Sequence, residues 1–281
     1  MKNDYGPWAV VTGASAGIGK EFAIQLADAG LNVVLVARRR AKLVELATTL
    51  GQRNVQVEVL RADLTERKGL EQVIEATRSL DVGLLVNNAG TGVFGDFLRN
   101  SADAEASVVD LNVRAPIVLS HAFGNRMRAR GKGGILILSS LVGLLGVRSF
   151  ANYAATKAYD LALAEGLAAE TSGIIDVHAV LPGFTESEYM DGMDITRIPL
   201  PLAKASHVVS GALHGLGRRR VLIVPGMINK MMAFVTTYSP RWLNTWAMGR
   251  LMGRMKPKSL PAGSGSSPVV ADAAPSAEGR E

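Results

Sequence analysis

The sequence predicts an α/β fold in which helices cover both faces of one parallel, doubly wound sheet. Short apolar runs alternate along the chain with longer segments that show helical periodicity. The apolar runs are rich in Val, Ile and Leu without polar alternation, which is typical of strands buried on both faces. With 281 residues, of which 48% are hydrophobic, the chain is long enough to form one large core.

Seven apolar runs predict seven strands, and the segments between them predict the connecting helices. The predicted strands are residues 8–12, 32–37, 55–62, 83–88, 134–140, 174–182 and 220–225. A first helix over 20–30 and a second over 40–51 each end at a glycine, which readily closes a helix. Thr65 is expected to cap a helix that runs towards Arg78. Right-handed crossovers would bring the carboxyl ends of the strands to one edge of the sheet.

The composition excludes several classes of protein and site. There is no cysteine, which excludes disulfides and thiolate chemistry. The first residues lack the apolar stretch of a signal peptide, and no apolar run is long enough for a membrane-spanning helix. The four histidines form no metal-type cluster with acidic residues, so we expect them to be structural: His121, His178, His207 and His214. We therefore expect a cytoplasmic protein, or one peripheral to a membrane, without a metal site.

The net charge of +6 is distributed unevenly along the chain. Residues 195–271 contain eleven lysines and arginines but no acidic residue, whereas the rest of the chain has 20 basic and 25 acidic residues. A basic end on an acidic body can serve an anionic partner, and it can equally be a solvated surface. It contains no recognised nucleic-acid-binding motif, so we do not expect nucleic acid as the partner.

A glycine-rich loop, "VVTGASAGIGKEF", connects the first predicted strand to the first helix. Gly13, Gly17 and Gly19 permit a tight turn and let the backbone approach a pyrophosphate closely. The start of the following helix offers unpaired N–H groups and a partial positive charge. A plain strand-to-helix turn is the alternative, but a loop at the start of an alternating chain favours nucleotide binding.

Three motifs together carry a resemblance to a known family. "TGASAGIG" at 12–19 resembles the cofactor loop of the classical short-chain dehydrogenases/reductases, and "NNAG" at 87–90 resembles their second signature. "YAATK" at 153–157 resembles their catalytic Tyr-x-x-x-Lys motif. The motifs occur in the order and spacing of the family, and the resemblance covers about residues 8–225. It implies a single Rossmann-type domain that binds a nicotinamide cofactor and transfers a hydride.

The resemblance also implies a catalytic tetrad. Tyr153 and Lys157 share one helix face, and a nearby ammonium favours the phenolate form of a tyrosine. Tyr153 would exchange a proton with the substrate oxygen, and Lys157 would assist it and bind the nicotinamide ribose. Of Ser139 and Ser140, the family spacing selects Ser140 to hold the substrate oxygen. Asn112 would position a water in the proton relay to Lys157.

The remaining expected cofactor contacts follow from the same resemblance. Asp63 would lie near the adenine, and a turn after the sixth strand would pack on the nicotinamide, with Thr185 preferred over Ser187 for its carboxamide. The full predicted set is Gly13, Ser15, Gly17, Ile18, Gly19, Arg38, Arg39, Asp63, Leu64, Asn88, Ala89, Gly90, Tyr153, Lys157, Pro182, Gly183 and Thr185. Residues 186–201 are polar and proline-punctuated, which suits a mobile substrate lid.

The end of the second strand predicts NADP(H) as the cofactor. An NAD enzyme usually offers a carboxylate there to the ribose 2′-hydroxyl. This chain has Ala37 at that place, followed by Arg38, Arg39 and Arg40. Guanidinium groups would bind a 2′-phosphate, with Arg38 the favoured contact and Arg39 the second. The alternative is a solvated basic start to the next helix, although cations are poorly placed at that end.

The C-terminal residues divide into a helical cap and a tail. We expect a catalytic domain over 1–226, a basic, Met-rich helical cap over 227–259 and a disordered tail over 260–281. Residues 227–238 form a clear amphipathic pattern, whereas Arg250 and Arg254 interrupt the apolar arc of 241–256. The cap would cover the substrate and rest on an anionic membrane surface. The alternatives are packing onto the body, or a homodimer or homotetramer interface.

The sequence therefore predicts an NADPH-dependent oxidoreductase that reduces a hydrophobic ketone or aldehyde, or catalyses the reverse oxidation. A lipid-derived, acyl or steroid-like substrate suits a Met-rich cap, because methionine surfaces adapt to flexible apolar ligands. The alternative is a non-catalytic NADP(H)-binding redox sensor with the same fold. Such a sensor needs the cofactor pocket but not the proton donor, so Ser140, Tyr153 and Lys157 together argue against it.

Overall fold

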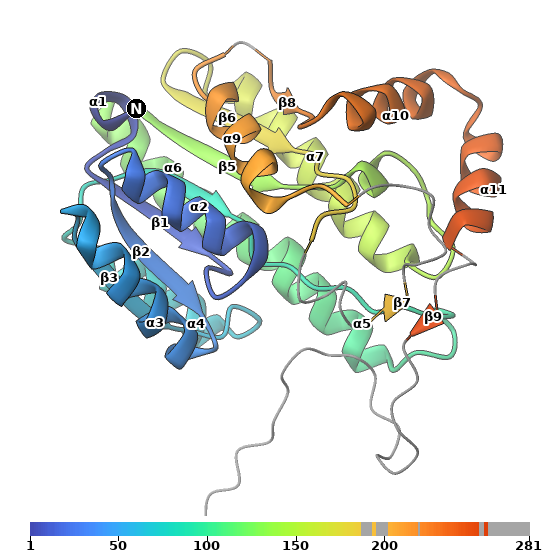
Figure 1. Cartoon of the computed structure of the whole chain (residues 1–281), viewed down its shortest axis with the longest axis horizontal. Coiled ribbons are helices and arrows are strands. Elements are labelled where there is room, and N and C mark those ends of the chain that lie inside the picture. Colours follow the sequence, from blue (N-terminus) through green and yellow to red (C-terminus); the bar gives the residue numbers. More distant parts are fainter. Residues whose placement is uncertain (187–192, 195–201, 219, 253–255, 258–281) are drawn as a thin grey trace, which may run out of the picture.

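Seven parallel strands form one twisted sheet in the computed structural model, which describes residues 1–186, 193–194, 202–218, 220–252 and 256–257. The order across the sheet is β3-β2-β1-β4-β5-β6-β8 (Figure 1). The strands are β1 (Trp8–Thr12), β2 (Asn32–Ala37), β3 (Val57–Arg61), β4 (Val82–Asn87), β5 (Gly133–Leu138), β6 (Ile175–Val180) and β8 (Leu222–Ile223). The predicted doubly wound parallel sheet is confirmed.

The first two strands match their predicted spans, whereas the last one does not. β1 and β2 span the predicted residues, and β1 pairs with β2 on one side and β4 on the other. The last strand, at one edge of the sheet, is shorter than the predicted 220–225. Only Leu222 and Ile223 pair, with Ala179 and Val180 of β6.

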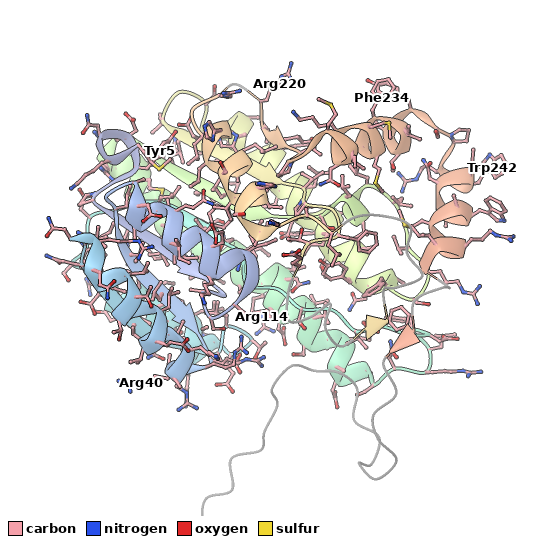
Figure 2. The ribbon with its side chains drawn as sticks, viewed as in Figure 1. Tyr5, Arg40, Arg114, Arg220, Phe234 and Trp242 are labelled. Carbon is pink, nitrogen blue, oxygen red and sulfur yellow. The ribbon has the colours of Figure 1, made fainter. Side chains whose placement is uncertain are left out.

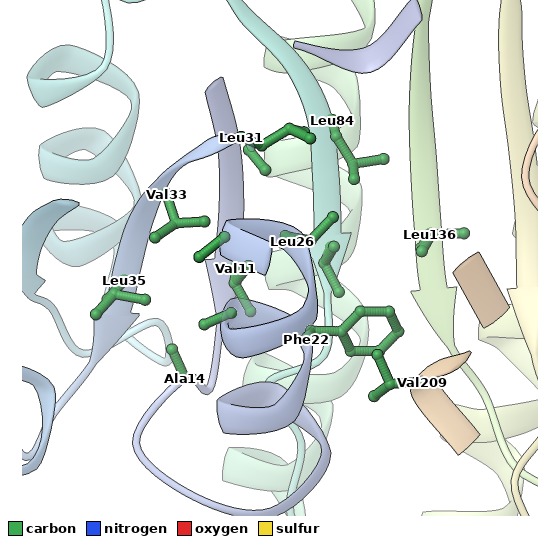
Figure 3. Close-up of a cluster of buried hydrophobic side chains, with 14 of the residues drawn as sticks. Val11, Ala14, Phe22, Leu26, Leu31, Val33, Leu35, Leu84, Leu136 and Val209 are labelled. Carbon is green, nitrogen blue, oxygen red and sulfur yellow. The ribbon is translucent and has the colours of Figure 1, made fainter. Parts of the chain in front are cut away.

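Helices cover both faces of the sheet because successive strand residues point to opposite sides. Val11 and the strand residues that point to the same side of the sheet pack against α2 (Gly17–Asp28), α3 (Arg40–Leu50) and α9 (Ala205–Gly215). Figure 3 shows Phe22 and Leu26 of α2 in this cluster. Val10 and the strand residues that point to the opposite side pack against the other layer, which consists of α4 (Arg67–Ala76), α6 (Ala115–Arg130) and α7 (Ala151–Glu170).

The remaining elements are short or lie outside these two layers. They are α1 (Lys2–Tyr5), η1 (Gly51–Arg53), α5 (Ala102–Val109), the π-helix η2 (Asp110–Arg114), η3 (Leu141–Leu144), β7 (Met193–Asp194), α10 (Met227–Tyr238), α11 (Arg241–Met252) and β9 (Lys256–Pro257). Tyr5 of α1 is buried, and its hydroxyl donates a hydrogen bond to Asp176 at 2.5 Å. This bond fixes the start of the chain to the beginning of β6.

The predicted cap of α4 is wrong. The helix begins after Glu66, and the Thr65 hydroxyl donates a hydrogen bond to the Asp63 carboxylate at 2.7 Å instead. The same oxygen accepts the Thr65 N–H at 3.0 Å. Thr65 therefore belongs to an Asp-initiated turn that precedes the helix, a common alternative use of such residues.

The two C-terminal helices leave most of their apolar side chains exposed. On α10 only one side, which includes Asn229, Met232 and Ala233, faces the body. Phe234 and Trp242 are 64% and 73% exposed, and Figure 2 shows both projecting away from the molecule. The alternative in which α10 packs its broad apolar face onto the body is therefore not met within one chain.

Two predicted segments lie wholly or mostly outside the residues that the structure describes. The tail over 260–281 and most of the lid over 186–201 lie outside the described residues. Within the part of the chain that the structure describes, no helix is both long and apolar enough to cross a membrane.

Candidate active site

A cavity of about 350 Å³ opens at the carboxyl ends of the central strands. These strands flank the point where the chain order reverses between β1 and β4, which is where such sheets bind ligands. The cavity is lined by Gly13, Ser15, Ala16, Gly17, Ile18, Ala37, Arg38, Arg39, Ala62, Asp63, Leu64, Thr65, Asn88, Ala89, Gly90, Thr91, Gly92, Leu111, Leu138, Ser139, Tyr153, Lys157 and Pro182.

Most of the predicted site residues line this one cavity. The five that do not are Gly19, Asn112, Ser140, Gly183 and Thr185. They surround it: Gly19 supports the glycine loop, Ser140 follows a lining residue, and Gly183 and Thr185 follow Pro182. The structure therefore brings together segments that lie far apart in the sequence.

The glycine loop has no room for side chains at two of its glycines. Gly13 has φ of +66°, and a Cβ there would lie 2.7 Å from the Asn88 side-chain nitrogen. A Cβ on Gly19 would lie 2.3 Å from the same nitrogen. Asn88 fills this space in order to donate a hydrogen bond to the Thr12 carbonyl at 2.9 Å. The two sequence motifs therefore form one packed unit.

Thr12 joins the ends of β1 and β4 and was not predicted as a site residue. Its hydroxyl donates to the Val86 carbonyl at 3.2 Å and accepts the N–H groups of Asn88 and Ala89 at 2.9 and 3.0 Å. Its place at the end of a buried strand, directly before the first loop glycine, was the available signal.

The start of α2 suits a pyrophosphate. The helix begins at Gly17, and no side chain caps its first N–H groups. Its first turn has no acidic residue, so the positive end of the helix dipole is not offset there. Since the loop backbone and these N–H groups line the cavity, the residues present fit the diphosphate of a dinucleotide.

Arg38 and Arg39 lie at the rim of the cavity, beside Ala37 at the end of β2. The Arg39 guanidinium donates hydrogen bonds to the Ser15 hydroxyl at 3.1 and 3.3 Å. This contact brings a positive charge from the second strand to the glycine loop. Arg40 begins α3, is exposed and does not line the cavity.

Tyr153 and Lys157 lie one helical turn apart on α7, and both line the cavity. The Lys157 ammonium lies 5.9 Å from the centre of the Tyr153 ring. Lys157 is buried and donates to the Leu138 carbonyl at 2.6 Å and to the Asp160 carboxylate at 2.8 Å. Burial is the largest effect and acts to lower the pKa of Lys157, but the charges of Asp160 and Tyr153 and the hydrogen bond to Asp160 together raise that pKa above its ordinary value.

The serines after β5 have different partners. The Ser139 hydroxyl is buried and donates to the Lys157 carbonyl at 2.6 Å, so it holds α7 against the strand end. The Ser140 hydroxyl has only long contacts, at 3.4 Å with the Val142 N–H and 3.5 Å with the Pro182 carbonyl. Ser140 is therefore the more available of the two for an external oxygen.

Asn112 is fully buried in the π-helical turn η2. Its side-chain oxygen accepts the Thr91 N–H at 2.9 Å, and its nitrogen donates to the Thr91 carbonyl and the Thr156 hydroxyl at 2.8 and 3.0 Å. The side chain thus binds the cavity wall to α7. Gly90 separates it from Lys157, because a Cβ there would lie 3.4 to 3.5 Å from both side chains.

The turn after β6 is held by neighbouring segments. A Cβ on Gly183 would lie 2.3 Å from the Asn229 side-chain oxygen, so α10 packs directly on this turn. The Thr185 hydroxyl donates to the Gly183 carbonyl at 3.0 Å and is buried. Ser187, the alternative to Thr185, lies outside the described residues.

The histidines contact backbone or side-chain groups of their own neighbourhood. Hydrogen-bonding distances join the Nδ1 atoms of His178 and His214 to the carbonyls of Arg220 and Ser210, at 2.9 and 2.8 Å. Among the described residues, no group of three or more His, Cys, Asp or Glu side chains is arranged to hold a metal ion.

Residues 7–196 match the family described as short chain dehydrogenase. This match covers more than half of the chain, including the glycine loop, the Asn-Asn-Ala-Gly segment and the Tyr-x-x-x-Lys motif.

The chain belongs to the short-chain dehydrogenase family.

Curated relatives of this short-chain dehydrogenase include enzymes named for hydrophobic substrates. It is 33% identical to 7beta-hydroxysteroid dehydrogenase of Clostridium sardiniense over 187 residues, which are 66% of this chain and 72% of that protein. It is 30% identical to very-long-chain 3-oxoacyl-CoA reductase of Neurospora crassa over 258 residues, which are 88% of this chain and 74% of that protein.

Solved structures of similar proteins share the fold over nearly their whole length. A 7beta-hydroxysteroid dehydrogenase structure superposes with a TM-score of 0.81 at 26% identity, covering 88% of this chain and 98% of that one. A short-chain dehydrogenase from Sphingobium yanoikuyae in complex with NADPH gives 0.74 at 33% identity, covering 84% and 97%. The chain is therefore an oxidoreductase by family, acting on hydroxyl or keto groups.

Replacing Thr12 tests how far the cavity depends on the junction of β1 and β4. Thr12→Val keeps the side-chain size but leaves the Ala89 N–H without its acceptor and the Asn88 N–H with only the Val86 carbonyl. A buried N–H group without an acceptor costs about 1–3 kcal/mol. We expect the free energy of unfolding to fall by about 2 kcal/mol and the affinity for a nicotinamide cofactor to fall with it. Urea unfolding and cofactor fluorescence titration measure both.

Thr48→Val is the matched control for this variant. The Thr48 hydroxyl is exposed and donates to the Val44 carbonyl within its own helix. Its loss should change neither quantity appreciably. Equal effects of the two substitutions would show that the Thr12 junction is not special.

Proposed function

We propose that this short-chain dehydrogenase uses NADP(H) to reduce a hydrophobic ketone or aldehyde to an alcohol, or to catalyse the reverse oxidation. The observation that carries the proposal is the position of Tyr153 and Lys157 in the same cavity as the glycine loop. A cofactor held by that loop would extend towards the phenol.

In the proposed reaction the cofactor would supply the hydride and the protein side chains would supply the proton and hold the substrate. Bound NADPH would supply the hydride to the carbonyl carbon at the expense of a nicotinamide C–H bond, giving NADP⁺. The Tyr153 hydroxyl donates its proton to the carbonyl oxygen, so its O–H bond and the C=O π bond break while a new C–H and a new O–H bond form. Ser140 holds the same oxygen with its hydroxyl. Lys157 stabilises the resulting phenolate and binds the nicotinamide ribose.

In this scheme Asn112 holds neighbouring groups in place. Because Thr91 and Thr156 use both N–H donors of its amide and one lone pair of its oxygen, we assign it the role of fixing the cavity wall beside Lys157. A relay water at this place would donate to the remaining lone pair of the amide oxygen.

An apolar cluster beside Tyr153 supports a hydrophobic substrate. The ring centre of Tyr153 lies 5.8 Å from that of Phe150, and the ring centre of Phe150 lies 5.1 Å from that of Phe94. Met248 and Leu251 of α11 join the same cluster. The C-terminal segment thus contributes apolar surface near the proton donor, as a cap over a steroid-like or long acyl substrate would. The substrates named for the relatives above fit this chemistry.

The rim of the cavity supports NADP(H). Ala37 offers no carboxylate to repel a 2′-phosphate, and Arg38 and Arg39 line the cavity beside it. The Arg39–Ser15 contact directs one guanidinium towards the loop. Asp63, held in its turn by Thr65, and Leu64 would enclose the adenine.

Removing the Tyr153 hydroxyl tests the catalytic proposal. Tyr153→Phe should lower kcat at least a hundredfold, since positioned proton transfer contributes about 10²–10⁴-fold. NADPH affinity should change little. NADPH consumption with a panel of hydrophobic ketones and aldehydes gives the rates, and fluorescence titration gives the affinity.

Tyr159→Phe is the control, because Tyr159 lies on the same helix but is partly exposed and outside the cavity. If wild type bound NADPH tightly yet neither it nor the variants turned over the panel, the redox-sensor alternative would gain support.

Removing one arginine at a time tests the choice of cofactor. A charge-assisted hydrogen bond to phosphate is worth about 1.5–3 kcal/mol, so Arg38→Ala and Arg39→Ala should each weaken NADPH binding about tenfold or more. NADH binding should be nearly unchanged, and Arg40→Ala should affect neither cofactor. Titration of all four proteins with both cofactors decides this; wild-type NADH affinity equal to that for NADPH would contradict the proposal.

The exposed face of α10 and α11 supports a peripheral contact with an anionic membrane. Exposed Met227, Met231 and Phe234 lie on α10, and Trp242 and Trp246 lie on α11. Lys230, Arg241 and Arg250 lie on the same two helices, which contain no acidic residue. Apolar aromatic groups accompanied only by cations complement a lipid surface of negative charge. A second copy of the chain would carry the same positive charge, which disfavours self-association through this face.

Sedimentation with vesicles tests this contact. Vesicles of phosphatidylcholine with phosphatidylserine should bind the wild type, and Phe234→Ser with Trp242→Ser should reduce the bound fraction about fivefold or more. Leu98→Ser is the control, since Leu98 is 90% exposed on the body of the protein. Unchanged binding by the double variant, or a wild-type dimer that the double variant dissociates, would overturn the membrane assignment.

A further inference from the structure

A buried carboxylate lies beside the proposed catalytic lysine. Asp160 follows Lys157 by three residues on α7 and is 1% exposed. Its Oδ2 accepts a hydrogen bond from the Lys157 ammonium at 2.8 Å, whereas its Oδ1 is buried without a hydrogen-bond partner among the described residues. Burying a carboxylate with one unsatisfied oxygen is unfavourable, so a purely structural side chain at this place would be expected to be apolar.

The hydrogen bonds of the Lys157 ammonium leave one of its N–H donors for another partner. An ammonium has three N–H donors. One is used by the Leu138 carbonyl at 2.6 Å and one by Asp160, so a single donor remains. These two acceptors, one at the end of β5 and one on α7, fix the ammonium near Gly90 and 5.9 Å from the Tyr153 ring. The remaining donor is then available to the cofactor ribose.

The charges around the pair are few. The groups that act electrostatically on Lys157 are Asp160 and Tyr153, and the group that acts on Asp160 is Lys157. The other elements that meet them contribute neutral groups: the Leu138 carbonyl and Ser139 hydroxyl at the end of β5, the Asn112 amide in η2, and the Gly143 backbone in η3.

We propose that Asp160 is a positioning residue that orients the Lys157 ammonium and offsets part of its charge, and so sets the pH at which Tyr153 exchanges its proton. The inference rests on the proposed function and deepens it. Lys157 alone stabilises the Tyr153 phenolate. The negative charge of Asp160 opposes that effect, because a carboxylate next to the ammonium weakens its attraction for a phenolate.

The burial of Asp160 agrees with this arrangement. Burial raises the pKa of Asp160 above its ordinary value, and the charge and hydrogen bond of Lys157 act in the opposite direction. The carboxylate therefore depends on Lys157 to remain ionised, and the two groups respond together to any change at either one.

Replacing Asp160 by its neutral amide tests the proposal. Asp160→Asn keeps the size and one acceptor oxygen but removes the charge. We expect the pH midpoint of the oxidation rate, which requires phenolate, to move down by about half to one unit. Asp160→Glu, which restores the charge, should return the midpoint towards the wild-type value. Asp176→Asn, which alters a carboxylate far from the cavity, should leave it unchanged.

A second readout separates this proposal from the proposed function. Ultraviolet difference titration of each Asp160 form against the same form carrying Tyr153→Phe reports the Tyr153 phenolate without any turnover. A downward shift in Asp160→Asn supports the inference even if no substrate is found. Asp160→Ser removes the same charge if the amide prevents folding, as judged by circular dichroism. A folded neutral variant with wild-type midpoints in both measurements, and only reduced thermal stability, would overturn the inference.

Discussion

The hydroxyl of Thr12 is the junction on which the cavity depends. A doubly wound sheet opens at the place where two central strands part, and this opening must be held at a fixed width if a dinucleotide is to lie across it. Thr12 binds the end of β4 through three hydrogen bonds, and Asn88 returns a bond to the Thr12 carbonyl. The absence of side chains at Gly13 and Gly19 then becomes a steric requirement, because Asn88 occupies the space.

A comparable set of bonds surrounds Lys157. Ser139, Leu138 and Asp160 all bind either its backbone or its ammonium, so the residue is fixed at both ends by the strand and the helix that meet there. Asn112 adds a link from the facing helix through Thr156. Reactive groups held in this way need little reorganisation when a substrate arrives, which is the condition for effective electrostatic assistance.

The sequence was sufficient to predict the sheet, because strands buried on both faces appear as continuous apolar runs. It was also sufficient to predict most of the residues in the cavity, because a glycine-rich loop between a first strand and a first helix is a specific pattern. It was insufficient where hydrogen-bond choice decided the outcome. Thr65 prefers the Asp63 turn to a helix cap, and both uses suit a threonine before a helix. Asp160 carried a signal that was not used: it is an acid three residues after Lys157, on the same helix face, in a segment rich in alanine and leucine. The exposure of α10 could not be predicted, since an amphipathic pattern does not specify what covers it.

The contact between Gly183 and Asn229 has a consequence for how the enzyme can be altered. The first turn of α10 rests on the backbone that follows β6, so it is geometrically part of the proposed cofactor site even though it belongs to the C-terminal segment. The inner face of α11, by contrast, joins the apolar cluster beside Tyr153 through Met248 and Leu251. An engineer who wishes to change which molecule the proposed site accepts can therefore start from these α11 residues and leave α10 in place as far as Ala233, because Met232 and Ala233 pack on the core.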